Sequence, residues 1–480
     1  MKVKQLGIVL MIVCGLCAGF SVQAQDSDSL RLDLNTALEI ALSENPNVKV
    51  ADMEITKKEY AKKSAYGALL PQMDLIGQYQ RAIKRQTVYF DEGFGMGGGT
   101  IDPNEYTPEE RFVMQTVGKM FAPDPEKSGE GIQMGRLNVY TAGLNVSMPL
   151  VVPSLWKNIQ MSQVDIELAM EKARSSRIDL ANQVKKSFYS LLLAQASYEV
   201  FRETYATDSL NLENIRNRFN QGVVAEYDVI TADVRLKSLI PSILQSQNMM
   251  KIAELQLKML MGIDSEMPLR IVGSLDDYRS AMFDSIVPAD TSLMNNSDIK
   301  QFDLQAEMAQ KGYEIQKLQF APSLVSSFNY MYMSQNNDFK LRNYRWDPYS
   351  MLGITLSIPL FNGGQRYHNM KQSEIQLWQL QEQRKDVERG LKLSIKNSYD
   401  LMAKSMEQVV ATESAVEQAH KGYQITQKRY ETGMGTIVDV NAAALAITNA
   451  ELQYRNAIYD YLAAKADLEK TLGYDINETN

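Results

Sequence analysis

The most regular hydrophobic pattern in the chain lies between residues 154 and 218. These 65 residues contain neither Gly nor Pro, and apolar side chains recur three or four positions apart through the middle of the segment. The apolar positions are Ile166, Met170, Ala173, Leu180, Val184, Phe188, Leu191, Ala194, Tyr198, Phe201 and Tyr205. This spacing is the period of an α-helix, and one helix of this length would extend over roughly 98 Å at ~1.5 Å per residue. We therefore expect one long helix that packs lengthwise against neighbours of similar length.

The chain also repeats itself in sequence. Three segments of its first half return in the second half at an offset of 210 or 211 residues. The pairs are 143–150 with 353–360, 218–222 with 429–433, and 260–264 with 471–475. A constant offset over about 120 residues indicates one structural unit used twice. We expect a first repeat over 25–270, a linker over 271–292 and a second repeat over 293–480.

Each repeat is expected to contain a short helix, two strands, a long helix and a further short helix. In the first repeat, Asn35 is the expected N-cap of a short helix that breaks at Asn45-Pro46 and resumes to Leu70. The other expected helices are 226–261 with a kink at Pro241, then 297–319, 366–429 and 437–472. Two short helices placed end to end would match one long helix in length, which indicates a palisade of parallel helices.

Strand-like sequence occurs between the short and the long helices. Four segments alternate apolar with polar residues, at about 73–90, 136–151, 323–334 and 348–360. An ordinary half-buried sheet has the same alternation. Aromatic residues near the strand ends, and the absence of an apolar run of about 18 residues after residue 24, favour membrane-spanning strands. Because four strands cannot close a β-barrel, several chains would each contribute four.

The first 24 residues have the features of a secretory signal peptide. Two lysines precede an apolar run over 6–20, and Val-Gln-Ala at 22–24 forms a small-residue cleavage site. Cys14 and Cys17, the two cysteines of the chain, lie inside it, so we expect neither disulfides nor thiol chemistry in the mature chain. Loss of the two lysines would take the formal charge from −8 to −10, and this acidity argues against nucleic acid as a partner.

With these features, the chain after residue 24 resembles the TolC family of outer-membrane efflux and secretion channels. The residues that carry the resemblance are Leu38, Ala41-Leu42, Asn45-Pro46, Leu69-Leu70-Pro71, Ser147-Met-Pro149-Leu150, Ser357-Ile-Pro359-Leu360-Phe361-Asn-Gly-Gly364, Gly222 and Gly433. The most specific pattern is Arg-(Phe/Tyr)-x-x-Gly, with Asp-Val five or six residues later, which occurs at 218–222 and again at 429–433. The family has this pattern in its periplasmic hairpins.

The resemblance implies a mainly helical homotrimer in the outer membrane of a Gram-negative bacterium. Three chains of four strands would form one 12-stranded β-barrel in the outer-membrane lipid, and their helices would form a tapering α-barrel through the periplasm. Family members dock through periplasmic hairpins on an adaptor (membrane fusion) protein, which links them to an inner-membrane pump of RND, ABC or MFS type. The implied function is a passive conduit for the export of small molecules or polypeptides, without catalysis.

The resemblance also assigns roles to residues near the two hairpin turns. The implied gate residues at the periplasmic entrance are Asp228, Tyr430, Asp439 and Gly435. Gly435 takes the place of a family arginine and Ala442 that of a second acid, which leaves open what holds the entrance shut. The implied adaptor-docking residues are Arg218, Gly222, Val223, Arg429 and Gly433. From the residues alone, the glycines are also explained as turn residues with positive φ, and each Asp as a partner of a helix N-terminus.

Other motifs give little support to a different chemistry. Gly93-Phe-Gly95-Met-Gly-Gly98 matches a dinucleotide-binding fingerprint, but no helix is expected after it, and the segment 91–135 is expected as a long outer loop. His368 and His420 lack the neighbouring ligands of a metal site, so we expect no metal and no cofactor. Two alternatives to the channel are a periplasmic coiled-coil scaffold without a transport pore and a secreted enzyme with a helical stalk, which would need a reactive cluster that the sequence does not offer.

Overall fold

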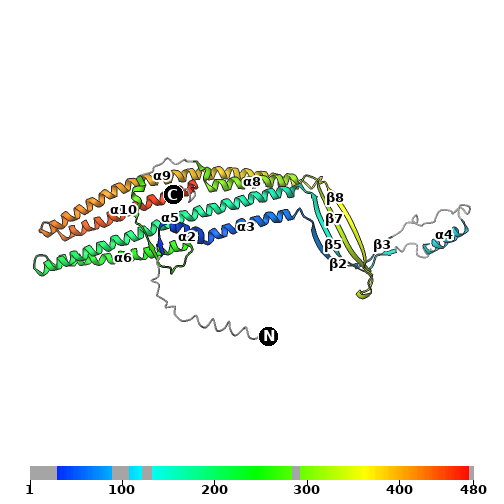
Figure 1. Cartoon of the computed structure of the whole chain (residues 1–480), viewed down its shortest axis with the longest axis horizontal. Coiled ribbons are helices and arrows are strands. Elements are labelled where there is room, and N and C mark those ends of the chain that lie inside the picture. Colours follow the sequence, from blue (N-terminus) through cyan, green and yellow to red (C-terminus); the bar gives the residue numbers. More distant parts are fainter. Residues whose placement is uncertain (1–29, 89–106, 122–131, 284–291, 475–480) are drawn as a thin grey trace, which may run out of the picture. The chain divides into compact units, whose positions relative to one another are not determined.

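Figure 1 shows the structure, a computed structural model, which describes residues 30–88, 107–121, 132–283 and 292–474. The predicted signal peptide, 1–24, and the glycine-rich segment 93–98 lie outside the described residues. The chain divides into two compact units. The first consists of Met1–Ala61, Met161–Tyr313 and Gln372–Asn480, and the second of Lys62–Gln160 and Glu314–Lys371. The two long helices contribute residues to both units.

Two long helices account for much of the described chain. The predicted long helix is α5, Pro153–Asn220, with 68 residues, and its counterpart α9, Gln365–Glu431, has 67. Each is followed by a helix of 36 residues, α6 over Glu226–Met261 and α10 over Ile437–Leu472, and Pro241 lies inside α6 without ending it. Helices α5 and α6 form the first hairpin, and α9 and α10 form the second. None of the helices in the described segments has both the length and the apolar character of a membrane span.

The first short helix begins at a different cap from the predicted one. Helix α2, Leu34–Glu44, is capped by Asp33, whose carboxylate accepts a hydrogen bond from the Thr36 amide at 2.9 Å. The prediction of Asn35 as the cap is therefore wrong. Asp33 lies just before the helix, from where a side-chain oxygen reaches the third helical N–H, whereas Asn35 already lies inside the first turn.

Two asparagines occupy equivalent places before the next helices. The Asn45 amide donates a hydrogen bond to the Leu260 carbonyl at 2.8 Å, and the Asn296 amide donates one to the Thr471 carbonyl at 2.7 Å. The helices that begin after them are α3, Pro46–Gly67, which is shorter than predicted, and α8, Ser297–Leu318. Both asparagines are buried, so each hydrogen bond satisfies a carbonyl near the C-terminal end of the helix that closes a hairpin.

The core of the first unit lies where α5, α6 and α10 meet. Phe188, Leu257 and Ile458, one from each helix, have no exposed surface. The segment predicted as a linker adds Leu275 and Met282 to this core. Its described elements are β6, Leu269–Ile271, which pairs in parallel with β1, Leu30–Leu32, then η2, Leu275–Tyr278, and α7, Arg279–Phe283. The linker segment therefore helps to hold the helices of this unit together.

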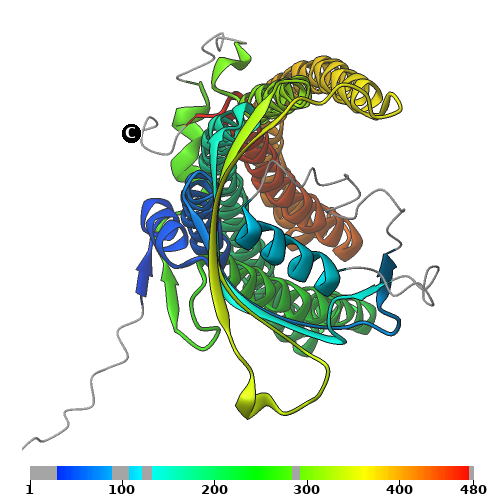
Figure 2. The same ribbon diagram turned by 90° about the vertical axis from the view of Figure 1, so that its right-hand side faces the viewer.

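The second unit contains a four-stranded antiparallel sheet, whose strands Figure 2 shows side by side. In spatial order the strands are β2, Gln72–Arg81, β5, Asn138–Val151, β7, Ser323–Asn336, and β8, Asp347–Ser357. Gly143 allows a close approach of two strands, because a Cβ there would lie 2.2 Å from the Tyr330 carbonyl oxygen. Tyr79 and Tyr140 stack across β2 and β5 with ring centroids 4.8 Å apart, a geometry that adds to the cross-strand stability.

The ends of this sheet and the segment beyond it differ from the prediction. The first strand ends at Arg81, and a separate strand β3, Gln86–Val88, pairs with β4, Ile132–Met134. Strand β8 ends before Pro359, which has no N–H to donate. The predicted outer loop includes a helix, α4, Pro108–Phe121, whose first turn is closed by reciprocal hydrogen bonds between Thr107 and Glu110.

Candidate functional site

Both hairpin turns lie in the first unit, at the same end of it in Figure 1. In the first turn the Gly222 N–H donates to the Phe219 carbonyl at 2.8 Å and the Val223 N–H to the Arg218 carbonyl at 2.9 Å. This pair of bonds is a Schellman motif, in which the residue after the helix adopts a left-handed conformation. Gly222 has φ 71°, which explains why Gly occupies this position.

The second turn repeats this backbone. The Gly433 N–H donates to the Tyr430 carbonyl at 3.1 Å and the Met434 N–H to the Arg429 carbonyl at 2.8 Å. Gly433 has φ 76°. No atom outside its own neighbours lies within 4 Å of a Cβ built at either turn glycine, so the backbone conformation rather than crowding requires Gly there. The two arginines of the predicted docking set therefore hold equivalent places in the two turns.

Tyr430 of the second hairpin is bound by the first hairpin. Its hydroxyl donates a hydrogen bond to Asp228 Oδ2 at 3.0 Å, and its side chain is 7% exposed. Burial, followed by the neighbouring Asp228 carboxylate, raises the pKa of Tyr430 to about 12. The phenol is therefore neutral and can act as a donor near neutral pH. The structure thus brings together two of the predicted gate residues.

Arg218 approaches the same tyrosine from the last turn of α5. Its guanidinium carbon lies 5.2 Å from the centroid of the Tyr430 ring, a cation–π contact. Its Nη2 donates a hydrogen bond to the Glu431 carbonyl at 3.2 Å. The predicted docking residue Arg218 therefore makes two contacts between the hairpins.

A small apolar cluster lies beneath these contacts. Its buried members come from all four hairpin helices and are Leu212, Ile215, Ala232, Tyr430, Ile437 and Val440. Tyr430 is both the largest side chain of this cluster and the one that carries the hydroxyl. The cluster and the polar contacts therefore depend on the same residue.

The other two predicted gate residues have local roles within the second turn. Asp439 Oδ2 accepts a hydrogen bond from the Thr436 N–H at 3.0 Å and the Asp439 N–H donates one to the Thr436 hydroxyl oxygen at 3.2 Å, which forms a capping box at the start of α10; the Thr436 hydroxyl also donates to Asp439 Oδ2 at 2.8 Å. The Thr436 hydroxyl, followed by its backbone N–H, lowers the pKa of Asp439. A Cβ at Gly435 would lie 3.3 Å from the backbone nitrogen of Tyr430. A role of either residue at a pore entrance stays a prediction.

The first hairpin contains a buried ion pair that was not predicted from the sequence. Arg235 Nε lies 2.9 Å from Asp208 Oδ2, and these side chains are 13% and 6% exposed. Burial raises the pKa of Asp208, although the nearby Arg235 opposes that shift. The two residues are 27 positions apart on different helices, so no spacing rule for one helix could have paired them.

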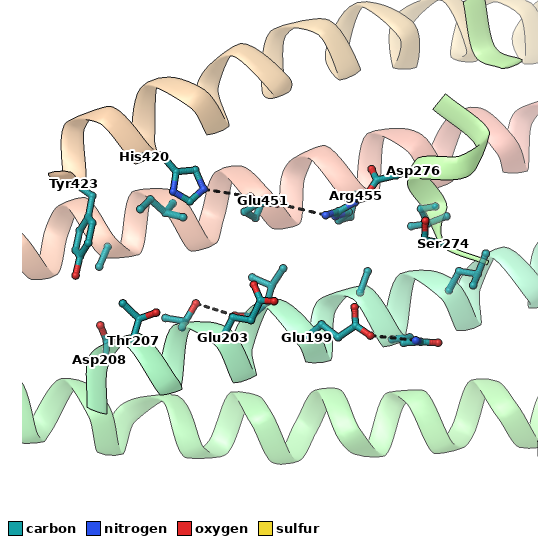
Figure 3. A pocket seen from close by; sticks show the side chains of 18 of the residues that line it. Glu199, Glu203, Thr207, Asp208, Ser274, Asp276, His420, Tyr423, Glu451 and Arg455 are labelled. Carbon is teal, nitrogen blue, oxygen red and sulfur yellow. Dashed lines mark hydrogen bonds and ion pairs between the residues drawn. The ribbon is translucent and has the colours of Figure 1, made fainter. Parts of the chain in front are cut away.

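A second site is a cleft of about 330 Å³ between α5 and α10 (Figure 3). Glu199 and Glu203 line its α5 side. On the other side, Glu451 lies 3.5 Å from His420 Nε2 and 3.8 Å from Arg455, which also pairs with an acid of η2. Within the described part of the chain, no group of three or more potential metal ligands occurs. The Arg455 cation of this cleft is thus paired with neighbouring acids, and the hairpin turns are the better candidate site.

The model of a family described as "Outer membrane efflux protein" matches residues 37–263 and 289–474. The outer membrane protein TolC of Vibrio cholerae serotype O1 is 22% identical over 342 residues, which cover 70% of this chain and 77% of that protein. The alkaline protease secretion protein AprF of Pseudomonas aeruginosa is 22% identical over 335 residues, which cover 68% of each protein.

A solved structure has the same fold. The structure of CusC matches with a TM-score of 0.71 at 16% identity and covers 93% of this chain and 94% of that chain. At this identity the match shows a shared arrangement of helices and strands, and it covers almost the entire length of both chains.

Proposed function

This chain belongs to the outer membrane efflux protein family, and on that premise we propose that it is the outer-membrane channel of a tripartite efflux or type I secretion system. It is a protein of the outer membrane with a helical part in the periplasm. In the proposed function it is a passive conduit for small molecules or polypeptides that an inner-membrane pump delivers, so no catalytic step is involved. The observation that carries the proposal is the contact of Tyr430 with Asp228 and Arg218, which joins the turn ends of two long hairpins.

The proposed assembly is a homotrimer built from two repeats in each chain. Three copies of the four-stranded sheet would close into one cylinder in the outer membrane. Support for the repeat comes from the near-equal long helices, the two 36-residue helices and the equivalent hydrogen bonds of Asn45 and Asn296. Support for membrane strands comes from the apolar side chains that the single sheet leaves exposed, such as Leu75, Leu352 and Ile354.

The turn ends are proposed as the periplasmic entrance and as the docking site for an adaptor protein. Val223 and Met434 are 60% and 69% exposed at corresponding places of the two turns, and neighbouring apolar residues such as Tyr227 and Val438 are exposed as well. An adaptor with apolar side chains at its tip would cover them. The pump could be of RND, ABC or MFS type.

The gate part of the proposal concerns Asp228, Tyr430 and Asp439. The first two join the hairpins, so they would keep the entrance narrow. Asp439 would add negative charge near the entrance and attract cations. Replacement of Asp439 by Asn should therefore reduce the cation preference of the channel in planar bilayers, and an unchanged preference would rule out this carboxylate as a selectivity ring.

The channel is tested by conductance and by capture of its partners. Purified protein in planar bilayers should conduct ions, and Tyr430→Ala should conduct more than the unaltered protein because the joined hairpins separate. Mild cross-linking in cells should capture an adaptor and a pump with it. A periplasmic scaffold without a pore would instead fractionate with soluble proteins and show no conductance in either form.

A further inference from the structure

We propose that Arg218 is the latch that keeps the second hairpin against the first while the entrance is shut. The inference rests on the proposed function, since a latch implies an entrance that opens. It gives Arg218 a role that differs from adaptor docking, the role that the family pattern alone implied. Arg218 makes two contacts across the hairpins, one with the Tyr430 ring and one with the Glu431 carbonyl.

The contacts of Arg218 hold two different parts of the second hairpin. The guanidinium lies over the Tyr430 ring, while Asp228 Oδ2 accepts a hydrogen bond from the hydroxyl of the same residue. The first hairpin therefore binds Tyr430 by its ring and by its hydroxyl. The hydrogen bond to the Glu431 carbonyl adds a third contact at the C-terminal end of α9, where carbonyl groups lack helical partners and favour a positive charge.

Arg429, the equivalent arginine of the second turn, directs its hydrogen bond to its own hairpin. Arg429 Nη2 donates to the Met434 carbonyl at 3.3 Å, which belongs to its own turn. Gly435, at the place of the family arginine, has no side chain to contribute. Arg218 thus extends from the first hairpin to Tyr430 of the second. The positive charge beside Tyr430 therefore comes from the first hairpin, whereas the family arginine would lie in the second.

A docking role and a latch role differ in what they require of Arg218 when no adaptor is present. A docking contact has no effect until the adaptor binds. A latch sets the separation of the two turns in the isolated channel. The decisive measurements are therefore made on the purified full-length channel alone.

The first measurement is the distance between spin labels at Val223→Cys and Met434→Cys, two exposed positions of the two turns. The native cysteines lie in the predicted signal peptide and do not interfere. In the Arg218→Gln variant the population with separated turns should rise roughly tenfold, as expected for loss of one cation–π contact and one charged hydrogen bond. Arg218→Lys keeps the charge but loses the planar guanidinium group. Its population with separated turns should therefore lie between those of the unaltered protein and Arg218→Gln.

Arg216→Gln is the matched control. Arg216 lies two residues earlier on α5 and pairs with Asp233 of its own hairpin at 3.2 Å, so its loss should leave the label distance unchanged. A double-mutant cycle of Arg218→Gln with Tyr430→Leu should be non-additive, because both changes remove the same contact. Additive effects, or equal separation in Arg216→Gln and Arg218→Gln, would overturn the latch.

Conductance separates the latch from the proposed function. If Arg218→Gln widens the label distance and raises conductance roughly tenfold, both stand. If Tyr430→Ala raises conductance while Arg218→Gln changes neither conductance nor distance, the channel stands and the latch is wrong. If Arg218→Gln widens the distance but no variant conducts, Arg218 does join the hairpins, but the channel function is wrong and the latch is wrong with it.

Discussion

The two hairpin turns have the same backbone and make different contacts. In both, Gly in a left-handed conformation closes a Schellman motif after an Arg-aromatic pair. Tyr430 in the second turn is 7% exposed and donates its hydroxyl to the first hairpin, whereas Phe219, its counterpart 211 residues earlier, is 40% exposed and has no hydroxyl to donate. The hydroxyl hydrogen bond between the hairpins therefore runs only from the second hairpin to the first, since Phe219 cannot donate an equivalent one.

Asp228 and Asp439 hold equivalent places after the two turns but have different hydrogen-bond partners. Thr436, the residue before α10, binds Asp439 through its hydroxyl and N–H, but the equivalent residue before α6 is Ala225, which makes no side-chain cap. Without a capping hydroxyl, Asp228 is left to accept a hydrogen bond from Tyr430. Ala225 in place of a threonine therefore goes together with a contact between the hairpins instead of a local cap.

The largest loss of stability should come from removing the Tyr430 side chain, which distinguishes the second turn from the first. Tyr430→Ala should destabilise the joined turns by about 3–5 kcal/mol, because a buried aromatic ring and its hydrogen bond are lost together. Amide hydrogen exchange of the segment around 430–440 should then accelerate. Phe219→Ala is the control at the equivalent, more exposed position and should cost about 1 kcal/mol or less. Equal effects of the two changes would contradict the asymmetry of the turns.

A second test uses the ion pair that only one of the two hairpins has. Where the first hairpin has Asp208 and Arg235, the equivalent positions of the second are Ala419 and Ala446. Arg235→Ala should destabilise the first hairpin by roughly 3 kcal/mol, because it leaves the buried Asp208 carboxylate without its cation. The variant with both residues changed to Ala, as in the second hairpin, should regain part of the lost stability, because no unpaired buried charge is left. Hydrogen exchange and thermal unfolding measure both effects, and a double variant as unstable as Arg235→Ala would refute this account of the pair.

Elements with a strong local pattern were predictable from the sequence, and contacts between distant residues were not. The long helix around Phe188 and the turns at Gly222 and Gly433 follow from periodicity and from glycine in a left-handed conformation. The Thr107 cap of α4 had a sequence signal, Thr-Pro-Glu-Glu, that was hidden within a segment rich in Gly and Pro. The stacking of Arg218 on Tyr430 had none, since it depends on how two hairpins pack.

The two turns should become more alike when the first turn receives the cap of the second. Ala225→Thr should form a capping box with Asp228 and stabilise the start of α6 by about 1 kcal/mol. It should also weaken the hydrogen bond from Tyr430, since the same carboxylate would now bind the threonine. Spin labels at Val223→Cys and Met434→Cys should report a wider separation, with Ala225→Val as a control of similar shape without a hydroxyl. Unchanged separation in Ala225→Thr would mean that Asp228 can serve both partners.

The smallest effect concerns the pH dependence of the Asp439 cap. The hydrogen bonds from Thr436 lower the pKa of Asp439 below its ordinary value of 3.8, so the folded turn favours the ionised carboxylate. The resulting stability is present above about pH 4 and is lost as the pH falls through the lowered pKa of the folded state. The first turn of α10 should therefore fray at acid pH, which hydrogen exchange of residues 436–440 can follow after correction for intrinsic rates. In Asp439→Asn this pH dependence should disappear, because an amide does not titrate; if the fraying persists, another group causes it.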